Sequence, residues 1–398
     1  MNNLEFSYNN RFAQNNKDKI YFRLFKVQVI LNALIIFSYS AVTKNLLLFL
    51  PIGLNLLALY LKPNPQRIID RTNFLFQLFF QVYIIAQSYY YLIGVTMRLY
   101  NWNLPSSIAL FLVSLLVMYI PYTIVFFGRI QNTWLQLLSM LFIFEVVAMG
   151  TTDGVIDGTI LSLNHFVILL NDSAFMGAII FLLLTLVIMK HWSYPGPSMR
   201  LTKEANWKIL LLLLIFCIWF VIWNAFGGSG SFLKSFFTFN FSHVTFKPQN
   251  ILTGLEAGIA EELLFRYVFL TILLRAFRNH RYQIFYAAGI SSLCFGLLHL
   301  TNLAAGQNLA NTLNQVIFAF GMGLLMCGIY LYTKLFYIIV IFHTLLDTLV
   351  FSVSGVTMTG KVTVIDSIFT IVETILFILI AIGLLISVYN RRNRFNFG

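Results

Sequence analysis

Long apolar runs separated by short polar segments dominate the chain from residue 27 onward. Apolar runs of about 17–24 residues are long enough to cross the hydrocarbon core of a bilayer as helices. The pattern predicts about twelve such spans in this sequence. They lie at residues 27–43, 45–61, 74–97, 105–127, 133–150, 173–189, 208–226, 251–274, 283–299, 310–332, 335–353 and 367–389.

Two breaks in this pattern carry predictions of their own. Lys44 alone separates the first two runs, so we expect these runs to form a tight helical hairpin. The stretch 155–170 is apolar but contains polar residues such as Asp157 and His165. We interpret this stretch as a re-entrant or interfacial piece rather than as a span.

Composition places the chain in a lipid bilayer. Hydrophobic residues make up 59% of the chain and charged residues only 10%, whereas soluble domains average about 25% charged residues. The net charge of +12 could suggest nucleic-acid binding, but Lys and Arg lie at the predicted helix ends and form no basic face. The three cysteines fall inside apolar runs without metal-ligand spacing. We therefore expect no nucleic-acid partner.

The distribution of basic residues predicts the orientation of the chain. Placing the N-terminus in the cytoplasm puts most of the 26 Lys and Arg residues on the cytoplasmic side, as the positive-inside rule requires. Both termini are then cytoplasmic. The expected fold is an all-α polytopic integral membrane protein, with a C-terminal helical bundle that encloses an intramembrane polar cavity.

A segment rich in turn residues divides the chain in two. It reads His191-Trp-Ser-Tyr-Pro-Gly-Pro-Ser-Met-Arg200, and such clusters of Pro, Gly and Ser mark linkers. Ionisable residues within the spans are scarce before it and gather after it. The predicted organisation is a basic N-terminus at 1–26, a transmembrane bundle of unassigned role at 27–190, a cytoplasmic linker at 191–207, a domain with chemistry at 208–390 and a basic tail at 391–398.

The span 251–274 contains the sequence Glu261-Glu262-Leu-Leu-Phe-Arg266. A charged side chain near the bilayer centre costs at least about 2.5–3.5 kcal/mol, so these residues need partners or a polar cavity. Glu262 and Arg266 are four residues apart, lie on one helix face and can pair. Glu261 lies about 100° around the helix. The spacing therefore assigns Glu262 and Arg266 a supporting role and nominates Glu261 for chemistry.

Two further spans bring polar residues to membrane depth with the same spacing. Phe295 and His299 are four residues apart on one span, and His343 and Asp347 are four residues apart on another. At about 1.5 Å of rise per residue, the depths of these residues and of Glu261 are compatible with one cavity. We assign Phe295 itself to packing.

The residue types at this depth suit hydrolysis of a peptide bond. Two imidazoles and two carboxylates supply a base that deprotonates water and a group that stabilises an oxyanion. The same donors could hold a divalent metal such as zinc with one open position. No His-Glu-x-x-His pattern is present, so a metal-bound water and a metal-free water both stay open. The four candidates are Glu261, His299, His343 and Asp347.

Together these residues form three motifs on three spans. The motifs are Glu261-Glu262-x-x-x-Arg266, Phe295-x-x-x-His299 and His343-x-x-x-Asp347. In this order they resemble the motifs of the CAAX-protease and bacteriocin-processing (CPBP, or Abi) family of intramembrane proteases. The resemblance covers roughly residues 208–390, and the preceding part of the chain resembles no family that we can name.

The resemblance implies an endopeptidase that cleaves a membrane-associated protein or peptide. By this carry-over Glu261 and His299 activate water, and His343 and Asp347 stabilise the oxyanion or complete a metal site. The family has Asn or Asp at the last motif position, which is Asp347 here. The bacterial members of the family imply a multi-pass protein of a bacterial cell membrane, with bacteriocin maturation or immunity among the expected roles.

Two other functions stay open at this point. The chain could keep the family fold and motifs and act as a regulatory or bacteriocin-immunity scaffold, with the ionisable residues serving only as an ion-pair network. It could also be an ion-coupled transporter, although transporter repeats would place corresponding polar features in both halves of the chain. The remaining intramembrane carboxylates, Glu145 and Glu373, match no motif and are assigned to helix contacts. Gly321 and Gly323 are assigned to close helix packing.

Overall fold

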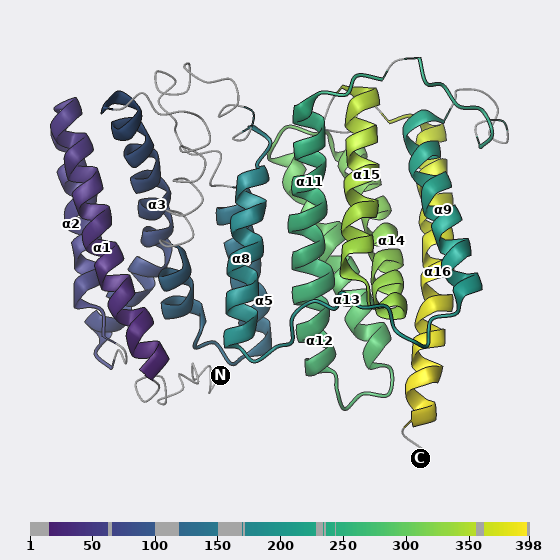
Figure 1. Ribbon diagram of the computed structural model, residues 1–398, viewed down its shortest axis with the longest axis horizontal. Coiled ribbons are helices and arrows are strands. Elements are labelled where there is room, and N and C mark those ends of the chain that lie inside the picture. The colour runs from purple at the N-terminus through teal and green to yellow at the C-terminus, as the bar shows by residue number, and fades with distance from the viewer. Residues whose placement is uncertain are drawn as a thin grey trace. The chain divides into compact units, whose positions relative to one another are not determined.

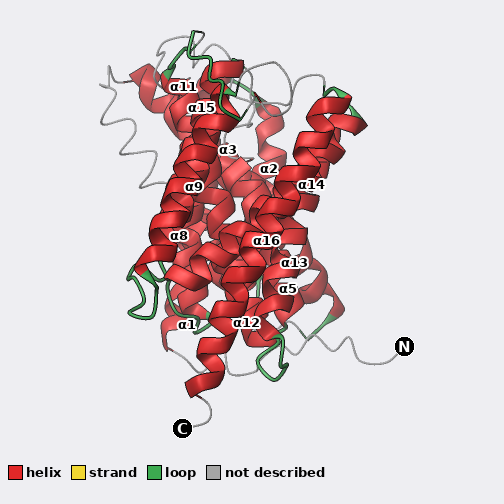
Figure 2. Cartoon of the chain, turned by 90° about the vertical axis from the view of Figure 1, so that its right-hand side faces the viewer, coloured by secondary structure: helices red, strands yellow, loops and turns green. Residues whose placement is uncertain are grey.

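The computed structural model shows a helical protein whose chain divides into two compact units, Met1–Pro195 and Gly196–Gly398. The described residues contain helices and loops but no β-strand (Figures 1 and 2). They are residues 16–62, 66–99, 119–149, 169, 172–227, 234, 236–242, 244–355 and 362–395.

The N-terminal unit begins with a helical hairpin. Lys44 adopts a left-handed φ of 56°, which ends α1. The side chain of Asn45 then accepts a hydrogen bond from the backbone N–H of Leu47 and caps the turn that leads into α2. The predicted hairpin is therefore present. The helices at this end of the chain are α1 (Asn16–Thr43), α2 (Phe49–Leu56) and α3 (Ile68–Leu99).

Two further apolar helices belong to the same unit. The α5 helix (Thr133–Ile143) continues into a π-helical turn at Phe144–Met149, and α8 spans Phe175–His191. The stretch 155–170, which we interpret as a re-entrant piece, lies outside the described residues apart from Leu169.

The C-terminal unit is a bundle in which α14 packs against α13 and α16, while α15 packs against α11 and α9 (Figure 1). A π-helical turn at Leu263–Phe269 joins α11 to α12, so the predicted span 251–274 is built from three consecutive elements. The helices are α9 (Trp207–Phe226), α11 (Pro248–Glu262), α12 (Leu270–Ala276), α13 (Gln283–Leu298), α14 (Leu309–Thr333), α15 (Phe336–Ser354) and α16 (Val364–Phe395).

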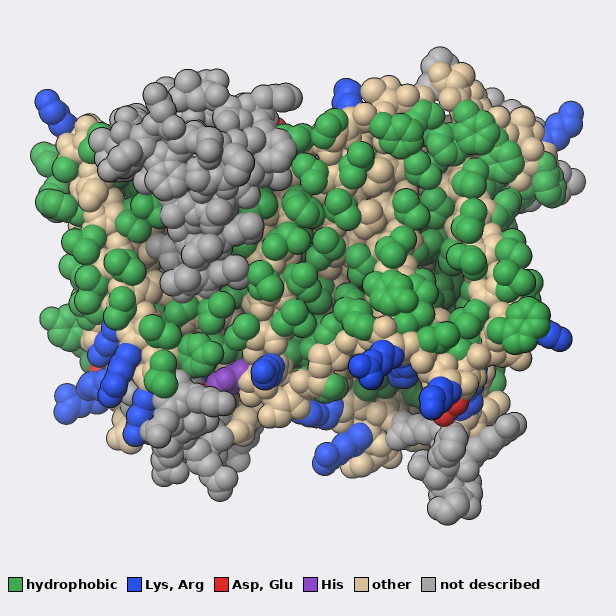
Figure 3. Space-filling model, viewed as in Figure 1, with side chains coloured by type: hydrophobic (Ala, Val, Ile, Leu, Met, Phe, Trp, Pro, Cys, Tyr) green, Lys and Arg blue, Asp and Glu red, His purple; other side chains and the backbone are tan. Residues whose placement is uncertain are grey.

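Six helices among the described residues are long and apolar enough to cross a membrane. The chain is therefore a multi-pass integral membrane protein, as its composition predicts. In the C-terminal unit, Figure 3 shows hydrophobic side chains over the helices and most Lys and Arg side chains toward one end. The six helices are Asp18–Thr43, Trp207–Phe226, Gln283–Leu303, Leu309–Thr333, Phe336–Ser354 and Val364–Arg391.

Two glycines bring the backbones of α11 and α15 close together. A Cβ added at Gly254 would overlap Oγ1 of Thr348, and one added at Gly258 would overlap Oγ1 of Thr344. Glycine permits such an approach because it lacks a side chain. This contact fixes α11 beside the helix that carries His343.

Candidate active site

The backbone changes from an α-helix to a π-helix directly after Glu261 and Glu262. The α11 helix ends at Glu262, and the chain continues as a π-helical turn in which every residue from Leu263 to Phe269 is buried. Short π-helical segments frequently mark functional sites. Within this turn, Nε of Arg266 lies 3.2 Å from Oε2 of Glu262, and both side chains are fully buried. The predicted ion pair is present.

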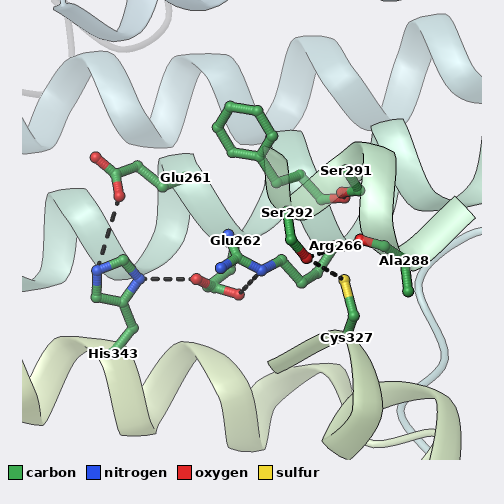
Figure 4. A network of polar contacts seen from close by, with 9 residues as sticks. Glu261, Glu262, Arg266, Ala288, Ser291, Ser292, Cys327 and His343 are labelled. Atoms are coloured by element: carbon green, nitrogen blue, oxygen red, sulfur yellow. Dashed lines mark hydrogen bonds and ion pairs between the residues drawn. The ribbon is translucent and has the colours of Figure 1, made fainter. Parts of the chain in front are cut away.

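Glu262 also contacts the imidazole of α15. Its Oε1 lies 2.8 Å from Nδ1 of His343 (Figure 4). A carboxylate paired with Arg266 is a hydrogen-bond acceptor, so Nδ1 is the donor in this contact. The sequence assigned Glu262 only to the arginine. The structure corrects this assignment, because one carboxylate joins the guanidinium to the imidazole.

The other imidazole nitrogen faces two carboxylates. Nε2 of His343 lies 3.5 Å from Oδ2 of Asp347 and 3.7 Å from Oε2 of Glu261. These separations exceed those of ordinary hydrogen bonds, but they bring both carboxylates to the same ring nitrogen. The side chains of Glu261 and Asp347 are 16% and 23% exposed, whereas that of His343 is 4% exposed. The two carboxylates are therefore the more accessible side of the cluster.

Phe295 connects His299 to this cluster. Its ring centroid lies 5.3 Å from the ring of His299 and 6.1 Å from the ring of His343. His299 is the C-cap of α13 and lies within electrostatic range of His343 and Asp347. The structure thus brings Glu261, His343 and Asp347 together, with His299 near them at the end of α13.

A metal-bound water is the alternative to a metal-free water at these donors. Within the part of the chain that the structure describes, no group of three or more His, Cys, Asp and Glu side chains is arranged to hold a metal ion. Nδ1 of His343 is bonded to Glu262, which leaves Nε2 facing Glu261 and Asp347. The chemistry of the site is derived below from the side chains alone.

Sequence reasoning missed the polar groups that surround the buried arginine. Oγ of Ser291 donates to the carbonyl oxygen of Phe265 over 2.7 Å, and Oγ of Ser292 lies 3.7 Å from Sγ of Cys327 (Figure 4). The adjacent serines in an otherwise apolar run were the available signal, because buried hydroxyls in a membrane helix need partners. Ser291 thus binds α13 to the π-helical turn that carries Arg266, and Ser292 lies between α13 and α14.

Comparison with known families agrees with the geometry. Residues 243–349 match the family described as type II CAAX prenyl endopeptidase Rce1-like. A search of curated proteins and a search of solved structures gave no match. The matched segment contains all three motifs, from Glu261 to Asp347. The resemblance to the CPBP intramembrane proteases is confirmed over residues 243–349, the part of the chain that is similar to the Rce1-like CAAX endopeptidases.

Proposed function

We propose that the chain is an intramembrane endopeptidase that hydrolyses a peptide bond of a membrane-associated protein or peptide. One observation carries the proposal. Inside the segment that matches a protease family, His343 is held by Glu262 on one side and faces Glu261 and Asp347 on the other. A fixed imidazole next to accessible carboxylates provides the groups that acid–base hydrolysis needs to transfer protons.

Glu261 acts as the general base in this proposal. A water between Glu261 and His343 loses a proton to the Glu261 carboxylate, and its oxygen attacks the carbonyl carbon of the scissile peptide. The 3.7 Å between Oε2 of Glu261 and Nε2 of His343 supports this placement, because one water beside the two atoms can reach both at hydrogen-bond distance. His299 assists from the end of α13 by accepting or returning a proton.

His343 stabilises the oxyanion that the attack creates. In its imidazolium form both ring nitrogens donate, so Nδ1 donates to Glu262 while Nε2 donates to the oxyanion. Asp347 supports this step, either by donating to the same oxygen when protonated or by holding the imidazole when ionised. The C–N bond then breaks, and the proton held by Glu261 passes to the leaving amine.

The proposal keeps the predicted topology of about twelve spans with both termini in the cytoplasm. It also keeps the bacterial cell membrane as the location. The substrate approaches from the bilayer, and the polar cluster gives its peptide bond a water-containing site within the protein.

Comparative peptidomics of membranes tests the proposal. Membranes that carry the wild-type chain should release peptides that disappear with Glu261→Gln. Glu373→Gln is the matched control, because it makes the same change to an intramembrane carboxylate on α16, outside the cluster. Both variants should accumulate at the wild-type level.

Two results would replace the proposal with an alternative. Identical peptides from all three membranes, together with an unchanged phenotype, would favour a scaffold that keeps the family motifs. Solute flux that depends on a proton or sodium gradient, without a peptide product, would favour a transporter.

A further inference from the structure

Arg266 occupies an unusual place for a charged side chain. It is fully buried, and its Nε pairs with Glu262 at 3.2 Å. Its Cζ lies 4.0 Å from the ring centroid of Phe295, which places the flat guanidinium over the aromatic face. An arginine over an aromatic ring is favourable, and more so where water is excluded. The guanidinium of Arg266 is thus stacked on the ring of Phe295.

A glycine on α14 makes the room for this stack. A Cβ added at Gly323 would lie 3.1 Å from Cδ1 of Phe295, 3.2 Å from Cβ of Ser292 and 3.3 Å from Nη2 of Arg266. All three distances are shorter than ordinary van der Waals contact, so a methyl group here would push on the ring and on the guanidinium together. Glycine is the residue that fits this position.

The other glycines of α14 face a different helix. A Cβ at Gly321 would meet Thr374, and a Cβ at Gly328 would meet Ala381, and both of these residues lie on α16. Gly321 therefore serves the close helix packing that the sequence predicts, and Gly328, for which the sequence analysis made no prediction, packs against the same helix. Gly323 points away from that contact and toward the buried arginine.

We infer that Gly323 and Phe295 are positioning residues for the hydrolysis proposed above, because they fix the position of Arg266 and, through it, that of His343. The contacts form a continuous series. Phe295 carries the guanidinium, Arg266 pairs with Glu262, and Glu262 accepts from Nδ1 of His343 at 2.8 Å. A displacement of Arg266 is transmitted to the imidazole, because Glu262 binds both groups with its two oxygens. The inference rests on the proposed function.

Gly323→Ala tests the positioning of Arg266, and Gly328→Ala on the same helix is the matched control. A Cβ at Gly328 would lie 3.2 Å from Cα of Ala381, so Gly328→Ala introduces comparable crowding on the opposite side. A shift of about 1 Å at a catalytic group can cost about 10²-fold in rate, and a methyl group demands a few tenths of an ångström. We expect kcat of Gly323→Ala to fall about tenfold with KM unchanged, and kcat of Gly328→Ala to stay at the wild-type value.

A second pair of variants tests the stacking of Arg266 on the ring of Phe295. Phe295→Leu removes the ring under the guanidinium, whereas Phe265→Leu removes a buried ring whose centroid lies 6.0 Å from Cζ of Arg266. Both remove similar volume from the core. We expect kcat to fall more for Phe295→Leu, at equal thermal stability of the two variants.

Activity is measured on the reconstituted full chain with the peptide found by peptidomics. Equal kcat values within each pair, with Glu261→Gln inactive, would contradict the positioning role of Gly323 and Phe295. The proposed function would not be affected by that result. Full activity of Glu261→Gln would overturn the proposed function and the inference with it.

Discussion

Two buried polar clusters, one in each unit, are of different kinds. In the N-terminal unit the cluster between α1, α2 and α3 is made of neutral carboxamides. Nδ2 of Asn55 donates to the carbonyl oxygen of Val29 over 2.8 Å, and Nε2 of Gln81 donates to Oδ1 of Asn55 over 2.9 Å. In the C-terminal unit the cluster around His343 contains a buried ion pair, because Arg266 and Glu262 are both fully buried.

This difference separates two uses of polarity in a membrane. Carboxamides cross-link helices at modest cost, because they donate and accept without carrying charge. Charges are expensive at membrane depth and mark functional sites. The contacts agree with this division, because the amide contacts tie three helices together, whereas the charged contacts end at two accessible carboxylates, Glu261 and Asp347.

The largest expected effect is the loss of activity in Glu261→Gln. A general base contributes about 10²–10⁴-fold to a rate, so kcat should fall by this factor while the unfolding midpoint stays near that of the wild type. Activity of the reconstituted chain and unfolding in mixed micelles are the two measurements. A variant that lost stability but kept activity would show that the charged cluster serves only the fold, as the amides do.

Removal of the buried arginine should affect stability and activity together. Arg266→Met leaves Glu262 as a buried carboxylate without its guanidinium, and breaking a buried pair in this way costs about 3–5 kcal/mol. Arg266→Lys keeps the charge but loses the planar group that stacks on Phe295. The free energies of unfolding should therefore follow the order wild type, Arg266→Lys, Arg266→Met. Equal stability of Lys and Met at this position would contradict the ion-pair account.

The sequence was sufficient to predict a helical membrane protein, because long apolar runs suit a bilayer. It did not decide the number of spans, since six helices among the described residues are long and apolar enough to cross a membrane. The four-residue spacing predicted the ion pair of Glu262 and Arg266. Whether twelve helices cross the membrane is not decided by length alone, since the span that carries Glu261 is assembled from α11, a π-helical turn and α12.

The contact of Glu262 with His343 could not be read from spacing. Glu262 and Arg266 belong to one helical segment, so their pairing is local. The imidazole arrives from α15, at a register that depends on the close approach at Gly254 and Gly258. For the same reason the sequence did not show that the ring of Phe295 lies near both imidazoles, those of His299 and His343. Interhelical register is a property of packing that a single sequence does not display.

A smaller effect is expected from the amides of the N-terminal unit. Asn55→Leu removes one donor to Val29 and one acceptor for Gln81, and interhelical hydrogen bonds in membranes contribute about 0.6–2 kcal/mol. We expect a loss of stability in this range and a wild-type kcat, both measured on the reconstituted chain. A specific loss of kcat would show that the N-terminal unit takes part in the chemistry, and the contrast between the two units would fail.

The smallest expected effect is that of a chelator. This experiment tests whether the charged cluster needs a metal ion for activity. Arg266 and the imidazolium of His343 supply the positive charge that a metal would otherwise supply to Glu261, Glu262 and Asp347. Among the described residues no three donors are arranged around a common metal position. Incubation with 1,10-phenanthroline should therefore leave kcat unchanged, with a zinc peptidase inhibited in parallel as the control. A loss of activity that added Zn²⁺ restores would mean that the donors rearrange around a metal. The charged cluster would then differ from the amides not only in charge but in needing an ion from outside the chain.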